Sequence, residues 1–189
     1  MDYQLAENLK GQLLIAMPSL ADPNFFQTVT CLSEHTAQGA MGVVINRVHA
    51  LLSAEDIFKE LNIDHTDQAA GIPIHIGGPV HLGEVFILHG PPFGWRGSLL
   101  ISDELALSNT LDILEAIAMG KGPSRFLISL GCAGWGPGQL EAEIRDNAWL
   151  TCPMDTAVLF DADVDERWET ALRRMGVAPD RLSSAAGHA

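Results

Sequence analysis

The residues of this 189-residue chain whose types and spacing could do chemistry are concentrated in one segment, Leu130–Leu140, which reads LGCAGWGPGQL. Its four glycines follow an apolar run, RFLISL, and precede a helix-like run, GQLEAEI. A glycine-rich connection from a strand to a helix is a place where backbone amides bind anions. The segment therefore predicts a strand-to-helix elbow over 131–138, which could serve as a phosphate cradle, hold a thiol nucleophile or form a tight structural turn.

Sequence criteria separate these three uses. A P-loop has a Lys and then a Ser or Thr after its last glycine, whereas Gln139 and Leu140 stand there. A nucleophile elbow has a glycine two residues either side of the nucleophile, and around Cys132 only Gly134 satisfies this. Because a helix N-terminus lowers the pKa of a thiol, a reactive Cys132 stays open as a hypothesis. The favoured interpretation is a turn that lets the main chain pass close to a sheet while Trp135 covers the core.

Other polar groups have structural explanations that compete with a site. Asn46 and Arg47 end the run GVVINR, and Arg47 binds either an anion or loop carbonyls, the second being favoured. The acidic run DADVDE resembles the start of an EF-hand loop but lacks its Gly and its final Glu, so helix capping explains it. His75, His81 and His89 match no common zinc spacing. We expect no metal and no cofactor.

The elements that must position these residues are short. Apolar runs bounded by Gly, Pro, Asn or Asp predict strands over 11–18, 28–32, 41–48, 72–76, 84–90, 98–102, 125–130 and 156–160. Amphipathic periodicity predicts helices over 53–61, 108–120 and 163–176, and a shorter one after Gly138. Ser53 is the expected N-cap of the first helix and Ser108 or Asn109 that of the second, while Asp163 and Glu166 have capping-box spacing in the third.

The apolar faces of the helices are expected to lie on the sheet. They are Ile57 and Leu61 in the first helix, Leu111, Leu114, Ile117 and Ala118 in the second, Val164, Trp168, Ala171, Leu172 and Met175 in the third, and Leu140 and Ile144 in the fourth. Several strands are apolar on both faces, which favours strands covered by helices. Because strands and helices do not alternate regularly, we expect an α+β fold with a mixed sheet. It forms a single domain over 1–182, followed by a flexible tail over 183–189.

Charge and cysteine usage limit the partners. With 11 Lys and Arg against 24 Asp and Glu, the formal net charge is −13, which disfavours direct DNA binding because phosphates are bound by basic side chains. Three cysteines without a CxxC pair indicate reduced thiols. The acidic N-terminus does not fit a signal peptide, and no apolar run is long enough to span a bilayer. We expect a cytoplasmic protein.

Several motifs together resemble one family. They are LLIAMPSLADPNFFQTV, GAMGVVINR, HIGGPV and LGCAGWGPGQLEAEIRDNAWL, followed by LFD and RW, and the combination resembles the AlgH/YqgE family of bacterial proteins from about Gly11 to Gly176. The family usually has an aromatic residue where this chain has Cys132, which weakens the thiol hypothesis. The resemblance implies a bifurcated mixed sheet curled into a pseudo-barrel with helices packed outside. It implies no established reaction, and the family is named for a regulator of alginate production.

The resemblance also selects residues to test. The positions that match the family's motifs are Asp22, Pro23, Asn46, Arg47, Gly77, Gly78, Pro79, Gly134, Trp135, Gly138, Gln139, Glu143 and Trp149. Eight of them are the candidate ligand-binding residues: Asn46, Arg47, Gly77, Gly78, Gly134, Trp135, Gln139 and Glu143. Glycines and aromatics suit turn geometry as well as a binding site, and we expect the polar members to disperse as loop braces.

Three functional hypotheses follow. The leading one is a non-enzymatic regulatory or binding protein that acts through a protein or small-ligand partner. The alternative is a hydrolase that stabilises an oxyanion with the amides of 131–138, using Cys132 or a nearby carboxylate. A DNA-binding transcriptional regulator is the third, and the net charge of −13 opposes it.

Overall fold

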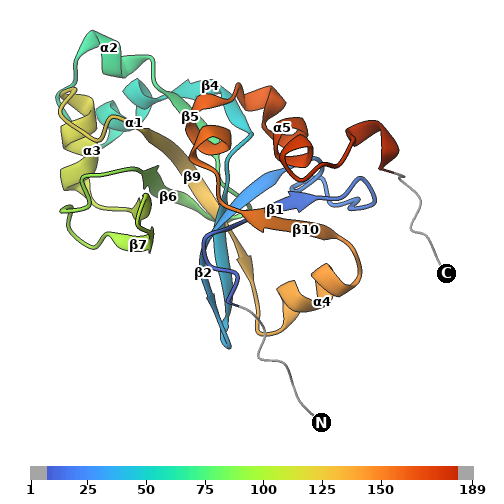
Figure 1. Ribbon diagram of the computed structural model, residues 1–189. Helices are drawn as coiled ribbons and strands as arrows, with labels where there is room; N and C mark the ends of the chain where they lie inside the picture. Colours follow the sequence, from blue (N-terminus) through green and yellow to red (C-terminus); the bar gives the residue numbers. More distant parts are fainter. Residues whose placement is uncertain (1–7, 183–189) are drawn as a thin grey trace.

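The computed structural model describes residues 8–182, and its central element is the long strand β9 (Phe126–Trp135) (Figure 1). Ahead of it lie β1 (Gln12–Ala16), β2 (Val29–Thr36), β3 (Gly39–Val44), β4 (Val48–Ser53), α1 (Ala54–Glu60), α2 (Asp67–Ala70), β5 (Pro73–Ile76), β6 (Val80–His89), β7 (Leu99–Ser102), β8 (Leu105–Ser108) and α3 (Leu111–Ala118). After it come α4 (Gln139–Arg145), β10 (Trp149–Pro153), the π-helix η1 (Ala157–Asp161), the 3-10 turn η2 (Val164–Glu166), α5 (Arg167–Arg174) and the 3-10 turn η3 (Pro179–Arg181). The predicted tail over 183–189 lies outside the described residues.

Strand β9 divides the sheet into two branches. One of its edges pairs antiparallel with β6. The other edge pairs first with β5, in parallel, and then with β3, antiparallel. From β3 the sheet continues through β2 and β1 to β10, from β6 through β8 to β7, and β4 pairs with β5. The fold is therefore α+β with a mixed, mainly antiparallel sheet that is not closed into a barrel, and the pseudo-barrel curl stays a prediction.

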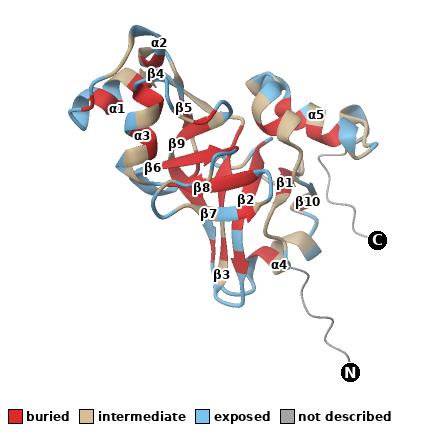
Figure 2. Ribbon diagram, turned by 60° about the vertical axis from the view of Figure 1, so that its left-hand side comes forward, coloured by how far each residue is buried: buried red, intermediate tan, exposed pale blue. Residues whose placement is uncertain are grey.

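The core consists of three apolar clusters, whose buried residues gather along the central strands in Figure 2. The first packs α5 and η1 against β1, β2, β6 and β8. The second packs α1, α2 and α3 together over β5, β6 and β9. The third surrounds Trp135 and Trp149 beneath α4, at the far end of β9. The predicted strands that are apolar on both faces are thus covered by helices.

The predicted helices are all present. Ser53 is the N-cap of α1, and its backbone N–H donates to the carboxylate of Asp56 over 2.9 Å. Leu140 is buried in α4, and α5 buries Trp168 and Leu172 as its periodicity predicts. No helix in the part of the chain that the structure describes is long and apolar enough to cross a membrane.

Details at the ends of two helices differ from the predictions. Leu61 is 42% exposed because α1 ends one residue earlier and Leu61 leaves the helical path as its C-cap. Helix α3 starts after Thr110, not after Ser108 or Asn109. Leu114, Ile117 and Ala118 are buried as predicted, but Leu111, at the first helical position, is exposed. Both errors arise because helix boundaries are the least certain part of a sequence pattern.

The prediction of a strand over 156–160 is wrong. This run is the π-helix η1, which buries Val158 and Leu159. A short apolar run does not distinguish a buried strand from a buried helical turn, because periodicity needs more residues to show itself. The capping box predicted for Asp163 is also wrong, since its side chain makes no cap hydrogen bond and α5 begins four residues later.

Candidate functional site

The predicted elbow over 131–138 is wrong in its first part, because Gly131–Trp135 continues strand β9. Ala133–Trp135 pair with β3 on one edge, and Cys132 pairs with Val80 of β6 on the other. The chain turns only beyond the strand, where Gly138 has a left-handed φ of 72° and caps α4. In this turn the N–H of Gly136 donates to the side-chain oxygen of Gln139 over 3.0 Å. In this turn the amides of Gly136 and Gln139 are therefore paired internally, the second with the carbonyl of Gly136 over 3.1 Å.

Gly77 and Gly78 carry the chain across β9. Strands β5 and β6 lie on opposite edges of β9, so the connection between them must pass over its backbone. A Cβ on Gly77 would lie 2.1 Å from the carbonyl oxygen of Gly131, and one on Gly78 would lie 2.3 Å from that of Cys132. Gly134 is less crowded, with an ordinary contact of 3.5 Å to a β6 side chain. The HIGGPV glycines thus have a steric role in the fold.

Glu143 ties two tryptophans to the turn. Its Oε2 accepts the indole N–H of Trp135 over 2.9 Å and that of Trp149 over 2.8 Å. Its Oε1 accepts from the amide nitrogen of Gln139 over 2.9 Å. Trp135 is 5% exposed, so the indole covers the core as the sequence predicts. We call these four residues the indole brace.

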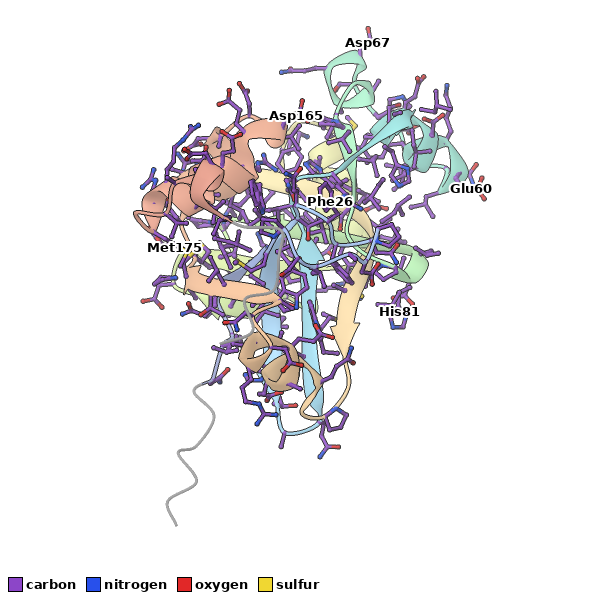
Figure 3. The ribbon with its side chains drawn as sticks, turned by 90° about the vertical axis from the view of Figure 1, so that its right-hand side faces the viewer. Phe26, Glu60, Asp67, His81, Asp165 and Met175 are labelled. Carbon is purple, nitrogen blue, oxygen red and sulfur yellow. The ribbon has the colours of Figure 1, made fainter. Side chains whose placement is uncertain are left out.

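Asn46 and Arg47 hold the loop between β1 and β2, whose Phe26 is labelled in Figure 3. The Arg47 guanidinium donates to the carbonyls of Pro23, Asn24 and Phe26 over 2.8, 3.0 and 2.8 Å. Asn46 accepts from the N–H of Val29 over 2.8 Å and donates to the carbonyl of Gln27 over 2.9 Å. The favoured prediction for Arg47, binding of loop carbonyls, is confirmed.

Phe25 joins the loop held by Asn46 and Arg47 to the indole brace, and no sequence pattern predicted this contact. The loop held by Arg47 places the Phe25 ring 6.0 Å from that of Trp135, stacked, and 5.4 Å from that of Trp149, edge-on. Aromatic pairs at these centroid distances stabilise one another beyond their buried area. The signal was the pair of phenylalanines inside the motif DPNFFQ. The structure therefore brings the motif residues of 22–28, 46–47 and 135–149 into one assembly of internal contacts, and their ligand-binding role stays a prediction.

The thiol of Cys132 is buried inside the sheet. It is 1% exposed, and burial, with a smaller contribution from the Glu84 carboxylate, raises its pKa to about 11. Cys31 is likewise buried, with its pKa raised to about 12. A nucleophilic cysteine needs the opposite, an accessible site and a lowered pKa. The geometry gives Cys132 the environment of a packing residue.

We expect Cys132 to react with a maleimide more than about 100-fold more slowly than glutathione at pH 7. A pKa of about 11 leaves only about one thiol in ten thousand ionised at that pH, against a few per cent for a free thiol, and burial slows access further. Labelling is followed by peptide mass mapping, with urea-unfolded protein as the control. Labelling of native Cys132 at the rate of glutathione would contradict this description.

A buried Ser–His pair lies at the junction of β6 and β8. The Nδ1–H of His89 donates to the carbonyl of Gly90 over 2.7 Å, so Nε2 is the acceptor for the hydroxyl of Ser108 over 2.9 Å. Ser108 also contacts the hydroxyl of Ser98 over 2.7 Å. A nucleophile and its base meet in this way in hydrolases. Here, however, both side chains lie in the core, and burial lowers the pKa of His89.

Arg167 is a buried cation that no sequence pattern predicted. Its guanidinium donates to the carbonyls of Ile45 and Ala162, and it lies 3.4 Å from Nε2 of His75. The Nδ1–H of His75 donates to the carbonyl of Ile128 over 3.2 Å, which leaves Nε2 as the acceptor for Arg167. Burial and then the Arg167 charge lower the pKa of His75 to about 4. Arg167 belongs to the motif RW, which was its only signal.

We expect the protein to lose about 3 kcal/mol of stability through His75 as the pH falls from 6.5 to 4. In this window the unfolded chain binds a proton at His75 and the folded chain does not, so unfolding is favoured. Above pH 6.5 both states are neutral at this position and the effect vanishes. Urea unfolding at pH 7 and pH 4.5 is compared between the wild type and His75→Gln. An equal loss in both proteins would show that His75 is not responsible.

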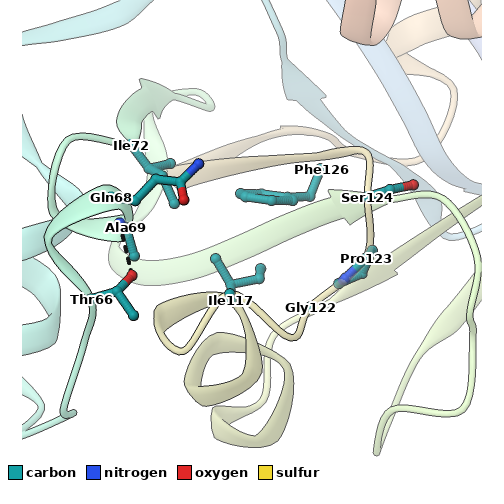
Figure 4. A pocket seen from close by; sticks show the side chains of 10 residues that line it. Thr66, Gln68, Ala69, Ile72, Ile117, Gly122, Pro123, Ser124 and Phe126 are labelled. Atoms are coloured by element: carbon teal, nitrogen blue, oxygen red, sulfur yellow. Dashed lines mark hydrogen bonds between the residues drawn. The ribbon is translucent and has the colours of Figure 1, made fainter.

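An open pocket of about 470 Å³ lies between α2, the end of α3 and the loop before β9. Figure 4 shows Ile72, Ile117 and Phe126 around it, with the polar side chains of Gln68 and Ser124 at its rim. None of the candidate ligand-binding residues lines it. Within residues 8–182, no three His, Cys, Asp or Glu side chains are grouped so that they could hold a metal ion.

Sequence comparisons give the chain close relatives in several bacteria. A UPF0301 protein of Desulforapulum autotrophicum is 52% identical over 181 residues, which cover 96% of each chain. A UPF0301 protein of Pseudomonas aeruginosa is 51% identical over 183 residues, again covering 96% of each. These alignments include Arg47, the crossing at Gly77 and Gly78, and the indole brace.

Solved structures give the same result for the fold. The solution structure of the AlgH protein from Pseudomonas aeruginosa matches the whole of both chains with a TM-score of 0.79 and 48% identity. A crystal structure of a protein from Corynebacterium diphtheriae matches 88% of this chain with a TM-score of 0.70 at 24% identity, a likeness of fold alone. Residues 13–180 match the family described as AlgH-like. This chain therefore belongs to the AlgH-like family, as its motifs indicate.

Proposed function

We propose that this protein is a cytoplasmic, non-enzymatic binding protein that acts through a protein partner. The observation that supports the proposal concerns the candidate catalytic groups of the segment 131–143. They are buried or hydrogen-bonded to other parts of the protein. The strand holds the first half of the glycine-rich segment, Cys132 is buried, and the side chains of Gln139 and Glu143 bond to the turn and to indoles. A catalytic group must instead reach a substrate.

The hydrolase alternative names Cys132 or a nearby carboxylate, and the structure adds the buried hydroxyl of Ser108. The Glu143 carboxylate accepts hydrogen bonds from both indoles and from Gln139, so it is engaged within the fold. The thiol of Cys132 carries a raised pKa, and the hydroxyl of Ser108 lies in the core beside His89. An oxyanion site needs donors aimed at open space, whereas the amide of Gly136 donates to Gln139. Direct DNA binding is opposed by the net charge of −13.

Turnover assays test the proposal. Activated esters, anilides and phosphate esters are incubated with the wild type, Cys132→Ala and Ser108→Ala, after circular dichroism has shown that the variants are folded. The proposal predicts rates equal to those of buffer for all three proteins. Steady turnover by the wild type that either substitution abolishes would overturn it.

A further inference from the structure

We propose that the groove between α1 and the start of β6 binds a short amphipathic segment of a partner protein, with leucine-like side chains flanked by Lys or Arg. This inference rests on the proposed function and names its site. The groove has a volume of about 360 Å³. Its apolar lining residues are Leu52, Ile57, Leu61, Leu82, Val85 and Leu130.

Two of the apolar side chains that line this groove are exposed to solvent. Leu61 is 42% exposed and Leu82 65%. Leu51 and Val80 are also exposed, but they do not line the groove. Isolated exposed leucines need no explanation, whereas two that face one apolar recess are typical of an interaction site.

The glycine crossing builds one wall of the groove. The chain crosses β9 at Gly77 and Gly78 and then enters β6. The pairing of β6 with β9 is interrupted by a bulge between Val80 and Val85. The bulge carries Leu82, whose side chain lies above Gly131, since a Cβ there would be 3.4 Å from it. The motif glycines thus place the apolar wall without touching a ligand themselves.

The charges around the groove decide the chemistry of the occupant. Asp56 and Glu60 line it, and Glu84, whose carboxylate lies 3.0 Å from Nδ1 of His81, is two residues beyond Leu82 on the bulge. Figure 3 shows Glu60 on α1 and His81 on the bulge at the same side of the molecule. The hydrogen bonds from Ser53 lower the pKa of Asp56, which keeps this carboxylate ionised. The one lysine of α1, Lys59, is bonded to Glu55 over 2.6 Å.

A segment that fills such a groove must bring apolar side chains to its floor and positive charge to its rim. A second copy of this chain does not satisfy this condition. A two-fold interface through the groove would bring the same three carboxylates of both copies together, where like charges repel. A basic, amphipathic segment of another protein satisfies both requirements.

Two synthetic helical peptides test the inference by calorimetry, one of Leu and Lys and the other of Leu and Glu. We expect the Leu/Lys peptide to bind with an affinity that falls as salt is added, and the Leu/Glu peptide not to bind. Leu82→Ser is expected to weaken binding about tenfold or more, and the pair Glu60→Lys with Glu84→Lys by a similar factor. Leu100→Ser, which removes an exposed leucine of β7, is the matched control and should bind as the wild type does.

Each other outcome overturns the inference. Three results would show that the groove does not bind a basic segment. They are no binding of the Leu/Lys peptide, equal binding of that peptide to Leu82→Ser and the wild type, and tighter binding of the Leu/Glu peptide. Dimerisation that Leu82→Ser abolishes would show that the occupant is a second copy. None of these results restores an enzymatic role, because only turnover in the assays above contradicts the proposed function.

Discussion

Replacing Gly78 with alanine is expected to destabilise the protein by about 4 kcal/mol or more, or to prevent folding. The new Cβ would lie 2.3 Å from the backbone carbonyl of Cys132, inside the central strand, where no flexible side chain can give way. The φ of Gly78 is +145°, a conformation that a residue with a Cβ rarely adopts. Urea unfolding followed by tryptophan fluorescence gives the free energy of unfolding.

The matched control for this change is Gly83→Ala in the β6 bulge. A Cβ on Gly83 would meet no atom within 4 Å, so the change should alter the free energy of unfolding by less than about 1 kcal/mol. Equal stabilities for the two variants would mean that the chain does not cross β9 at the distance described.

Replacing Glu143 with alanine is expected to cost about 2–4 kcal/mol of stability. The change leaves the indole N–H groups of Trp135 and Trp149 without their acceptor in a largely buried cluster. A buried donor that loses its partner costs about 1–3 kcal/mol. The fluorescence of the folded protein should change as well, because both indoles lose a charged neighbour.

Glu143→Gln distinguishes the hydrogen bonds from the two indoles from the hydrogen bond from Gln139. A glutamine oxygen can still accept from both indoles, but its amide would face that of Gln139, so the loss should be about half that of the alanine variant. Glu115→Ala, an exposed change on α3, is the control and should be nearly neutral. A stability loss in Glu143→Ala no larger than in the control would refute the brace.

Much of the fold could be predicted from the sequence. The Ser53 cap and the burial of Ile57 define α1, because local capping chemistry and helical periodicity agree there. The apolar run over 125–130 predicts the first half of β9, and the burial of Trp135 was also predicted. The family resemblance added the branching of the sheet, which periodicity could not provide.

What could not be predicted depends on contacts between distant segments. The run 156–160 has the composition of a strand, yet it packs as a helical turn. Gly131–Trp135 was expected to bend because it is rich in glycine, but it continues the strand, and Gly131 lets the crossing chain pass close, since a Cβ there would lie 2.6 Å from the carbonyl oxygen of Gly78. A glycine-rich segment is typical both of a bend and of a strand that another backbone approaches closely. Only the pairing partners of the segment distinguish the two.

The sequence identified residues of the candidate site, but it did not show the contacts that these residues make. Arg47 bonds to carbonyls of a loop that is distant in the sequence, at 23–26, whereas Glu143 bonds to Trp135 and Trp149, which lie within eight residues of it. The groove escaped notice because Leu61 was assigned to the buried face of its helix, and Leu82 belongs to an irregular bulge. Exposure of a leucine is a tertiary property that sequence periodicity cannot give.

The most direct test of the central claim is a nitrogen–proton NMR titration of the protein with the Leu/Lys peptide. The claim is that the motif residues support the fold while the groove binds the partner. We predict shifts of the backbone amides at 56–61 and 82–85, and unchanged amides at 22–28 and 136–139. Shifts confined to the loop and the glycine turn, with a silent groove, would contradict the account.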